Sequence, residues 1–306
     1  MTPGTPQDGF IADNPQAALF LTLTVQDAEQ AVVRVREIFA LFPDRVAALR
    51  DPVAGLDAVV GFGSQFWDRL HPQRRPKALH PFPELRDGPR HAPTTPGDIH
   101  LHIRSARRDL CFELGRQLVE ALGEAVTVIE EVDGFRYLDK RDLIGFVDGT
   151  ENPELARRRA VTLVAGEDPD FAGGAFVVVQ RYRHKMVNWK ALPVVEQEKI
   201  VGRTKADDIE FEGEDQPAFS HVSRNSLKED GVKLEILRQN MPWATTQQQG
   251  TYFIAYAKSP HPIEAMLRSM FIADPDGTYD RLLDYSDALT GATFFVPTRE
   301  LLKALA

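Results

Sequence analysis

Asp148, His221 and Arg238 are three chemically capable side chains that stand in mostly apolar surroundings. Asp148 lies in the stretch GFVDGTENP, residues 145–153, whose two glycines and proline indicate a tight turn that another group approaches closely. His221 lies in PAFSHV, and Arg238 ends the apolar run LEILR. Carboxylates and imidazoles move protons, imidazoles bind metals, and guanidiniums stabilise anions, so these residues are the first candidates for a chemical site.

The acid and the guanidinium also have a structural interpretation. Asp148 would then belong to an Asp-Gly turn in which its carboxylate bonds its own backbone. Arg238 enters the interior at the end of a predicted strand, so it must find an anion or an enclosed polar cavity there, and Asp148 is one candidate anion. The two residues are either a structural ion pair or a catalytic pair.

His221 qualifies as a metal ligand only if a partner fixes its second ring nitrogen and raises its basicity. A buried carboxylate does this best. Asp280, Asp284 and Asp287 crowd one later segment that supplies candidates. A structural histidine is the alternative.

Other metal and nucleophile patterns are weak. His100 and His102 fall on one face of a predicted strand, as a first-row metal pair would, but no third ligand follows at a suitable spacing, which favours partly exposed strand histidines. Cys111 is the only cysteine and lies between Leu110 and Phe112, which favours a core thiol and excludes an intrachain disulfide. The sequence contains no phosphate loop, G-x-S-x-G turn or H-E-x-x-H helix.

The composition is that of an ordinary globular protein. The 306 residues are 43% hydrophobic and 26% charged, and 36 basic against 45 acidic residues give a net charge of −9. This balance argues against binding nucleic acid over a broad surface. No secretory signal and no apolar run of about 20 residues is present, so we expect no membrane segment and a cytoplasmic location.

The first half of the chain contains the elements that must position these residues. After a start of about 14 residues expected to be disordered, alternating apolar residues predict strands over 19–25, 58–62, 99–103 and 125–129. Helical periodicity predicts one helix over 28–42, opened by a capping box of Asp27 and Gln30, and a second over 110–122. Residues 68–98 are interpreted as a long loop. The order β-α-β-β-α-β is that of a ferredoxin-like sandwich.

The same order recurs in the second half. Strands are predicted over 176–180, 232–237, 251–257 and 293–296, and helices over 194–201, after Pro262 and over 299–305. We therefore expect an α+β protein of two ferredoxin-like halves, residues 1–145 and 146–306. No residue-level repeat relates them.

Six segments in this order resemble the dye-decolorising peroxidases, and most closely the bacterial B-type subfamily. They are GFVDGTENP (145–153), VGRTK (201–205), SHV (220–222), RQNMP (238–242), and LDYS with LTGATFFVP (283–297). The resemblance covers nearly the whole chain. It implies a duplicated ferredoxin-like fold that holds haem b (iron protoporphyrin IX) in its C-terminal half.

The resemblance also implies roles for individual residues. Cofactor binding falls to three of them: His221 resembles the proximal iron ligand, Asp284 its carboxylate partner, and Arg203 the arginine that meets a haem propionate. Catalysis falls to the distal residues Asp148, Arg238 and Asn240.

The implied activity is reduction of hydrogen peroxide and oxidation of aromatic, phenolic or dye-like electron donors through a ferryl intermediate. Asp148 would shuttle the peroxide proton from one oxygen to the other while Arg238 stabilises the leaving anion. Trp189, Trp243, Tyr137, Tyr182 and Tyr256 are candidate electron relays, although core packing is the simpler interpretation of each.

Two features separate this chain from some relatives of that family. Glu151 resembles a carboxylate connected with manganese oxidation, but Lys233 and Lys228 fall where further acids would help, so we expect no efficient manganese site. The chain shows no obvious nanocompartment-targeting tail. A homo-oligomer is expected because it is common in the family.

Other classes of function remain open from the sequence. A haem-binding or haem-handling protein with little turnover, or a relative of the chlorite-decomposing haem enzymes, would use the same scaffold. The distal pair discriminates among them, because haem carriage needs His221 but has no use for both Asp148 and Arg238.

Overall fold

The computed structural model describes residues 4–7 and 9–305. In the first half, β1 (Ala17–Val25), β2 (Asp57–Gly63), β5 (Ile99–Ser105) and β6 (Val126–Phe135) pair in the order β2-β5-β1-β6, all antiparallel. Helices α1 (Glu29–Ala40) and α4 (Arg108–Leu122) connect them. This is the predicted β-α-β-β-α-β unit, since the first strand lies between the third and the fourth.

The second half repeats this arrangement. Strands β7 (Ala175–His184), β10 (Leu237–Arg238), β12 (Gln249–Ala257) and β14 (Ala292–Val296) pair in the order β10-β12-β7-β14. Helices α7 (Val194–Val201) and α9 (His261–Phe271) are the crossovers. The duplicated ferredoxin-like fold is therefore confirmed.

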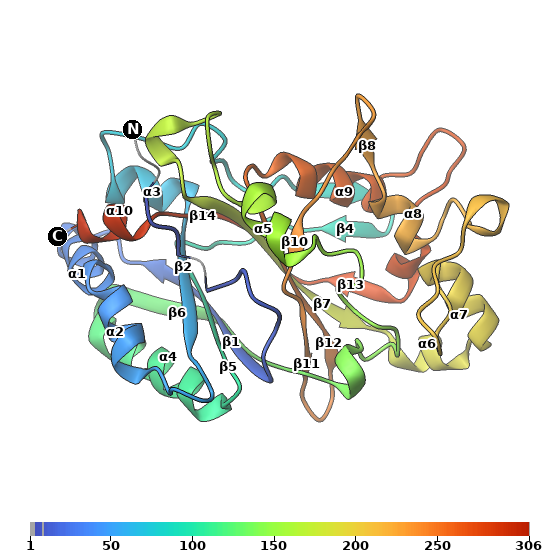
Figure 1. Cartoon of the computed structure of the whole chain (residues 1–306), viewed down its shortest axis with the longest axis horizontal. Helices are drawn as coiled ribbons and strands as arrows, with labels where there is room; N and C mark the ends of the chain where they lie inside the picture. Colours follow the sequence, from blue (N-terminus) through green and yellow to red (C-terminus); the bar gives the residue numbers. More distant parts are fainter. Residues whose placement is uncertain (1–3, 8, 306) are drawn as a thin grey trace.

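One strand pair joins the two halves. Strand β14 lies antiparallel to β2, so both four-stranded sets belong to one ten-stranded sheet, which also includes β11 (Met241–Ala244) and β13 (Ser286–Ala288). Figure 1 shows the first half at the left and the second half at the right of this sheet. Because β14 pairs with β2, the two halves share one sheet. The strands around the cavity of the second half are therefore continuous with the sheet of the first half.

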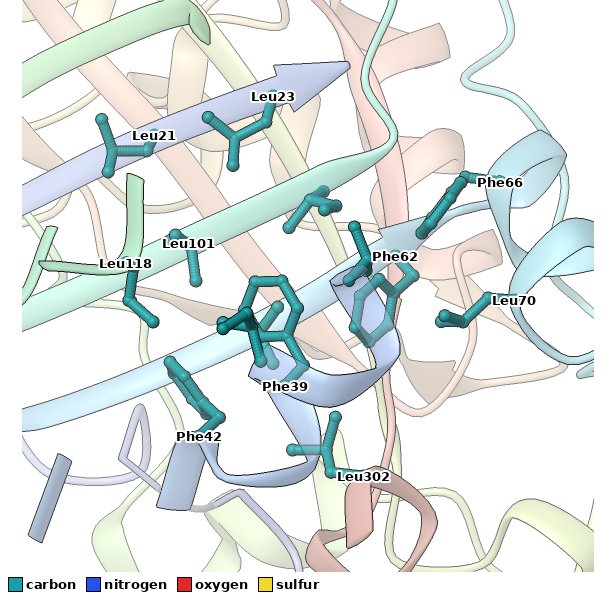
Figure 2. Packing of buried hydrophobic residues seen from close by; sticks show 14 of the residues in the cluster. Leu21, Leu23, Phe39, Phe42, Phe62, Phe66, Leu70, Leu101, Leu118 and Leu302 are labelled. Atoms are coloured by element: carbon teal, nitrogen blue, oxygen red, sulfur yellow. The ribbon is translucent and has the colours of Figure 1, made fainter. Parts of the chain in front are cut away.

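Buried apolar residues fill both faces of the sheet. In the first half, side chains of β1, β2 and β5 pack against α1 and α4, as Figure 2 shows for Leu21, Phe39, Phe62, Leu101 and Leu118. The other face of these strands packs against the second half through a separate cluster that includes Phe20, Tyr252 and Tyr256. A third cluster lies under α9.

The remaining elements are short. They are α3 (Ser64–Leu70), β3 (Leu85–Asp87), β4 (Arg90–Ala92), α5 (Leu155–Thr162), α6 (Met186–Ala191), α8 (His221–Asn225), β8 (Lys228–Glu229) and β9 (Val232–Lys233). Single 3-10 turns cover Gly123–Ala125, Leu138–Lys140, Pro169–Phe171, Gly213–Asp215 and Arg281–Asp284.

Four local predictions are wrong. The helix expected over 28–42 ends at Ala40, and a second helix, α2 (Phe42–Leu49), begins with Pro43 in its first turn, a position that suits proline. No side chain caps α1, so the capping box of Asp27 and Gln30 does not form. The strand expected over 232–237 is only β9 and β10, and the expected loop over 68–98 contains the β3–β4 hairpin.

The N-terminal segment also differs from expectation, whereas the helix expected over 299–305 is present. Of the first 14 residues, 1–3 and 8 lie outside the described part, but Phe10 is fully buried and the Gln7 amide donates to the backbone oxygens of Val60 and Pro297. Helix α10 (Arg299–Lys303) packs beside α1, and its Leu302 is buried in the core of the first half (Figure 2). A domain boundary between residues 145 and 146 stays a prediction.

Candidate active site

A cavity that is partly open to solvent lies in the second half, between β12, α8, α9 and the loop 142–148. Most of its wall is apolar. The apolar side chains are Ile144, Phe146, Val147, Val201, Ile236, Phe253, Ile263, Met266, Leu267, Met270, Leu282 and Leu283. Such a shape, apolar with a few convergent polar groups, is typical of a cofactor site.

His221 contributes an imidazole to this cavity from the start of α8. Ser220 caps the helix by accepting a hydrogen bond from the Ser223 amide, which fixes the backbone around His221. The His221 Nδ1 atom lies 2.6 Å from Oδ2 of Asp280, whose side chain is fully buried. The other ring nitrogen, Nε2, has no hydrogen-bond partner among the described residues and is therefore available to a ligand in the cavity.

The predicted pairing of His221 with Asp284 is wrong. The Asp284 carboxylate accepts hydrogen bonds from the Tyr279 hydroxyl and from Arg281 instead. The reason is the 3-10 turn over 281–284, because Asp280 precedes the turn, caps the Leu282 amide with one oxygen and turns the other inward. Asp284 ends the turn with its side chain 34% exposed.

Asp148, Arg238 and Asn240 also line the cavity, as the sequence predicted. The Asn240 amide donates to Asp148 Oδ1 at 3.4 Å, while its oxygen accepts from the Ile254 backbone. No hydrogen bond joins the side chains of Asp148 and Arg238 in the described structure, and Arg238 Nε has no partner there. Arg238 therefore acts on Asp148 through its charge and keeps free donors for a ligand.

Asn152 is a positioning residue that the sequence interpretation missed. Its amide donates to the Arg238 backbone oxygen, and its oxygen accepts from the Arg238 backbone nitrogen, both at 2.8 Å. The turn that carries Asp148 is thus bonded directly to the strand that carries Arg238. The sequence signal was available, since Asn152 belongs to the same punctuated stretch as Asp148.

Burial dominates the electrostatics of the distal pair. It raises the pKa of Asp148 above the ordinary aspartate value, with Arg238 opposing the rise and the nearby Asp142 adding to it. Burial likewise lowers the pKa of the Arg238 guanidinium, although Asp148 and Glu151 oppose this. A carboxyl with a raised pKa both accepts and returns a proton readily, which suits an acid–base role.

A second histidine–carboxylate pair in the cavity was also missed. Oδ1 of Asp142 lies 3.0 Å from His184 Nε2, and the other ring nitrogen of His184 bonds the Ser286 hydroxyl at 2.8 Å. Burial opposes the ionised form of Asp142, but His184 and the hydrogen bonds from Thr251 and the Ile144 backbone together outweigh it and lower the pKa of Asp142. No sequence spacing signals this pair, because the loop that carries Asp142 and the end of β7 that carries His184 meet only in the folded chain.

Arg203 is not among the residues that line the cavity. Its guanidinium donates to Asp208 at 2.8 Å and to Glu210 at 3.4 Å, and it lies 3.6 Å from Glu151. The expected contact with a haem propionate stays a prediction. On its other side, Glu151 accepts a hydrogen bond from Lys233 at 2.9 Å.

The remaining metal and nucleophile candidates are buried and form no metal site in the described part of the chain. His100 and His102 are both 1% exposed, so the expectation of partly exposed histidines is wrong, and in residues 4–7 and 9–305 no three His, Cys, Asp or Glu side chains group as a metal site would. Cys111 is buried, and burial raises the pKa of its thiol to about 12, which confirms a core thiol. No helix within the described ranges is long and apolar enough to span a membrane.

Comparisons with known proteins agree with this geometry. Two family models match the chain, "Dyp-type peroxidase, N-terminal" over residues 7–136 and "Dyp-type peroxidase, C-terminal" over residues 139–301. A dye-decolorizing peroxidase of Mycolicibacterium paratuberculosis is 48% identical, over 98% of this chain and 85% of the relative.

Two solved structures are similar over their whole length. A DypB variant of Rhodococcus jostii in complex with heme is 45% identical, with a TM-score of 0.96 and full coverage of both chains. A DypB variant in complex with manganese is 45% identical, with a TM-score of 0.95 and the same coverage. From the family models and this level of identity, the chain belongs to the Dyp-type peroxidase family and is a dye-decolorising peroxidase.

Proposed function

We propose that this chain holds haem b in the cavity of its second half and uses it to reduce hydrogen peroxide and oxidise aromatic, phenolic or dye-like donors. One observation carries the proposal. A histidine held by a buried carboxylate and an acid–guanidinium–amide group line the same apolar cavity. When bound, haem supplies an iron that accepts two oxidising equivalents from peroxide and passes them on singly.

The residues fit this cofactor on three counts. His221 has a free Nε2 for the iron, the apolar wall suits a porphyrin, and the buried Arg238 Nε has no partner in the described protein. Asp280 would accept a hydrogen bond from the His221 Nδ1–H group, which fixes the orientation of the ring and makes Nε2 more electron-donating.

The distal residues perform the proton chemistry. Asp148 accepts a proton from one oxygen of hydrogen peroxide and returns it to the other oxygen, which leaves as water. Arg238 stabilises the negative charge that develops on the leaving oxygen, and its position is fixed in advance by Asn152. Asn240 holds one Asp148 oxygen, so the other faces its substrate with a defined orientation.

Manganese is not expected to be an efficient donor for this chain. A similar DypB variant has been solved in complex with manganese. Here, Lys233 places its ammonium against Glu151 and Arg203 lies against the same carboxylate, so two cations already occupy the neighbourhood that a divalent ion would need. The cytoplasmic location and the homo-oligomeric state stay predictions of the sequence.

A haem-loading experiment with a matched control tests the proposal. The wild type should bind haem with a Soret band and oxidise dye only when peroxide is present. His221→Ala should lose or strongly shift that band. His261→Ala is the control, because it removes an exposed histidine that also bonds a carboxylate, Glu229, but does not line the cavity. An unchanged spectrum and haem content in His221→Ala would show that another residue holds the iron.

A further inference from the structure

Seven rings stack through the interior between the two halves of the chain. Successive centroids lie 3.9 to 6.2 Å apart, in the order Phe10, Tyr256, His102, Phe20, Tyr252, His100 and Phe294. Two of the rings are phenols, which are among the side chains most readily oxidised by one electron.

Tyr256 is bonded to a base inside this stack. Its hydroxyl lies 3.0 Å from His102 Nδ1, and both side chains are at most 1% exposed. His102 Nε2 has no partner in the described structure, and the Tyr256 hydroxyl has no acceptor there other than His102. The hydroxyl therefore donates, and Nδ1 accepts with a free lone pair. Burial supports this state, because it lowers the pKa of His102 well below the usual histidine value and keeps the ring neutral.

Tyr182 provides a contrast within the same molecule. It lines the cavity, but its hydroxyl donates to Oε1 of Gln180 at 2.8 Å. A primary amide does not accept a proton under ordinary conditions, whereas a neutral imidazole does. Loss of an electron makes a phenol strongly acidic, so a phenol can give up an electron inside a protein far more easily when a base stands ready for the proton. Tyr256 meets this condition and Tyr182 does not.

Tyr256 lies directly behind the wall of the cavity. Arg238 lines the cavity and pairs with Ala255 across β10 and β12, while Tyr256, the next residue, pairs with Leu237. Successive side chains of a strand point to opposite faces. The phenol is therefore separated from the distal residues by a single layer of backbone.

We propose that Tyr256 and His102 form a reversible one-electron store for this enzyme. When peroxide has oxidised the active site and no donor is present, Tyr256 loses one electron to that site, which is thereby reduced by one equivalent. The Tyr256 O–H bond breaks and its proton forms an N–H bond at His102 Nδ1, leaving a neutral tyrosyl radical beside an imidazolium. When a donor arrives, the electron and the proton return to Tyr256. This inference rests on the proposed function, since peroxide turnover supplies the oxidant.

Electron paramagnetic resonance tests the store. Haem-loaded protein is mixed with one equivalent of hydrogen peroxide without donor and frozen rapidly, while its absorption spectrum confirms that the peroxide has reacted. The wild type should show a tyrosyl signal. Tyr256→Phe should lose it, and Tyr182→Phe, the matched control, should keep it. His102→Gln, which retains a hydrogen-bond acceptor but removes the base, should lose the signal or shorten its lifetime.

Placing 3-fluorotyrosine at position 256 gives a second measurement that leaves the fold intact. The fluorine should split the radical signal if the unpaired electron resides on that ring. The store is refuted if the signal in Tyr256→Phe matches the wild type, if His102→Gln leaves it unchanged, or if the wild type consumes peroxide without any tyrosyl signal. In each case the peroxidase assignment stands. A wild type that does not react with peroxide at all contradicts both.

Discussion

The Nδ1 atom of His221 lies 2.6 Å from the Oδ2 atom of Asp280, and the carboxylate is fully buried while the imidazole is 33% exposed. The two residues come from α8 and from the entry of a 3-10 turn, 59 positions apart in the chain. The Asp280 Oδ2 atom holds the Nδ1 side of the ring, so the pair fixes which nitrogen faces the cavity.

Replacing Asp280 should impair the proximal side of the site. Asp280→Asn removes the negative charge that orients the His221 ring and makes its Nε2 more electron-donating. Loss of such a hydrogen-bonding partner of a metal ligand typically costs ~10- to 100-fold in metal affinity or activity. We expect weaker haem retention and a higher reduction potential, measured by haem transfer to a scavenger and by spectroelectrochemistry. Asp284→Asn is the matched control and should leave both near the wild-type values. The reverse ranking would restore Asp284 as the partner.

The reaction with peroxide should depend on pH through Asp148. Asp148 must be ionised to accept the peroxide proton, and burial raises its pKa above the usual aspartate value of ~3.9. The rate constant should therefore rise as the pH rises through this raised pKa and then level off. Because donor oxidation consumes protons, dye turnover should peak on the acidic side of neutrality.

Two variants check the origin of this pH dependence. Arg238→Leu removes a charge that opposes the rise in the Asp148 pKa, so the midpoint should move to higher pH. Asp148→Asn should abolish the dependence. An alkaline optimum that persists in Asp148→Asn would take Asp148 out of the proton path.

Arg238 should matter at least as much as Asp148 for the reaction with peroxide. Loss of a general base costs ~10² to 10⁴ in rate, but water in the pocket can take over part of the transfer. Loss of one preorganised charge costs ~10² to 10³ with little rescue. Arg238→Leu also raises the Asp148 pKa, so the double variant should be little slower than Arg238→Leu alone in stopped-flow measurements. A haem-retaining Arg238→Leu that reacts at the parent rate would make Arg238 structural.

Lys233 should keep manganese from being oxidised efficiently. Lys233→Glu replaces the ammonium on Glu151 with a carboxylate, near Glu210, and oxygen ligands of this kind suit Mn²⁺. We expect this variant to gain manganese oxidation, followed as the absorbance of the Mn³⁺–malonate complex. Lys228→Glu makes the same charge change in the same hairpin without touching Glu151 and should not. Equal gains in manganese oxidation in both variants would show that the added negative charge matters and that its position beside Glu151 does not.

The fold was predictable wherever one periodic apolar pattern belongs to a single element. The alternation over 19–25 and the helical stripe over 110–122 correspond closely to β1 and α4. Prediction failed where two elements share one apolar pattern. The stripe from Ala28 to Phe42 continues through a change of direction at Leu41, because both α1 and α2 bury their apolar residues in the same core.

Within the site, residue types were predictable and pairings were not. Asp148 and Arg238 line the cavity with His221, as expected from their settings, and so does Asn240, which only the family resemblance indicated. The choice of Asp280 over Asp284 depends on which way a 3-10 turn faces, and both aspartates have similar neighbours in the sequence. The pairing of Asp142 with His184 depends on how the loop after residue 141 folds against the end of β7, which spacing along the chain does not reveal.

A stopped-flow absorption measurement tests the central claim most directly. Ferric, haem-loaded protein is mixed with one equivalent of hydrogen peroxide, and an aromatic donor is added in a second mixing step. We predict a rapid change of the Soret and visible bands that depends on Asp148 and Arg238, followed by return of the starting spectrum as two equivalents of donor are oxidised. A protein that binds haem but shows no such change, or that only bleaches, would contradict a peroxidase function and leave the cavity a site for haem carriage.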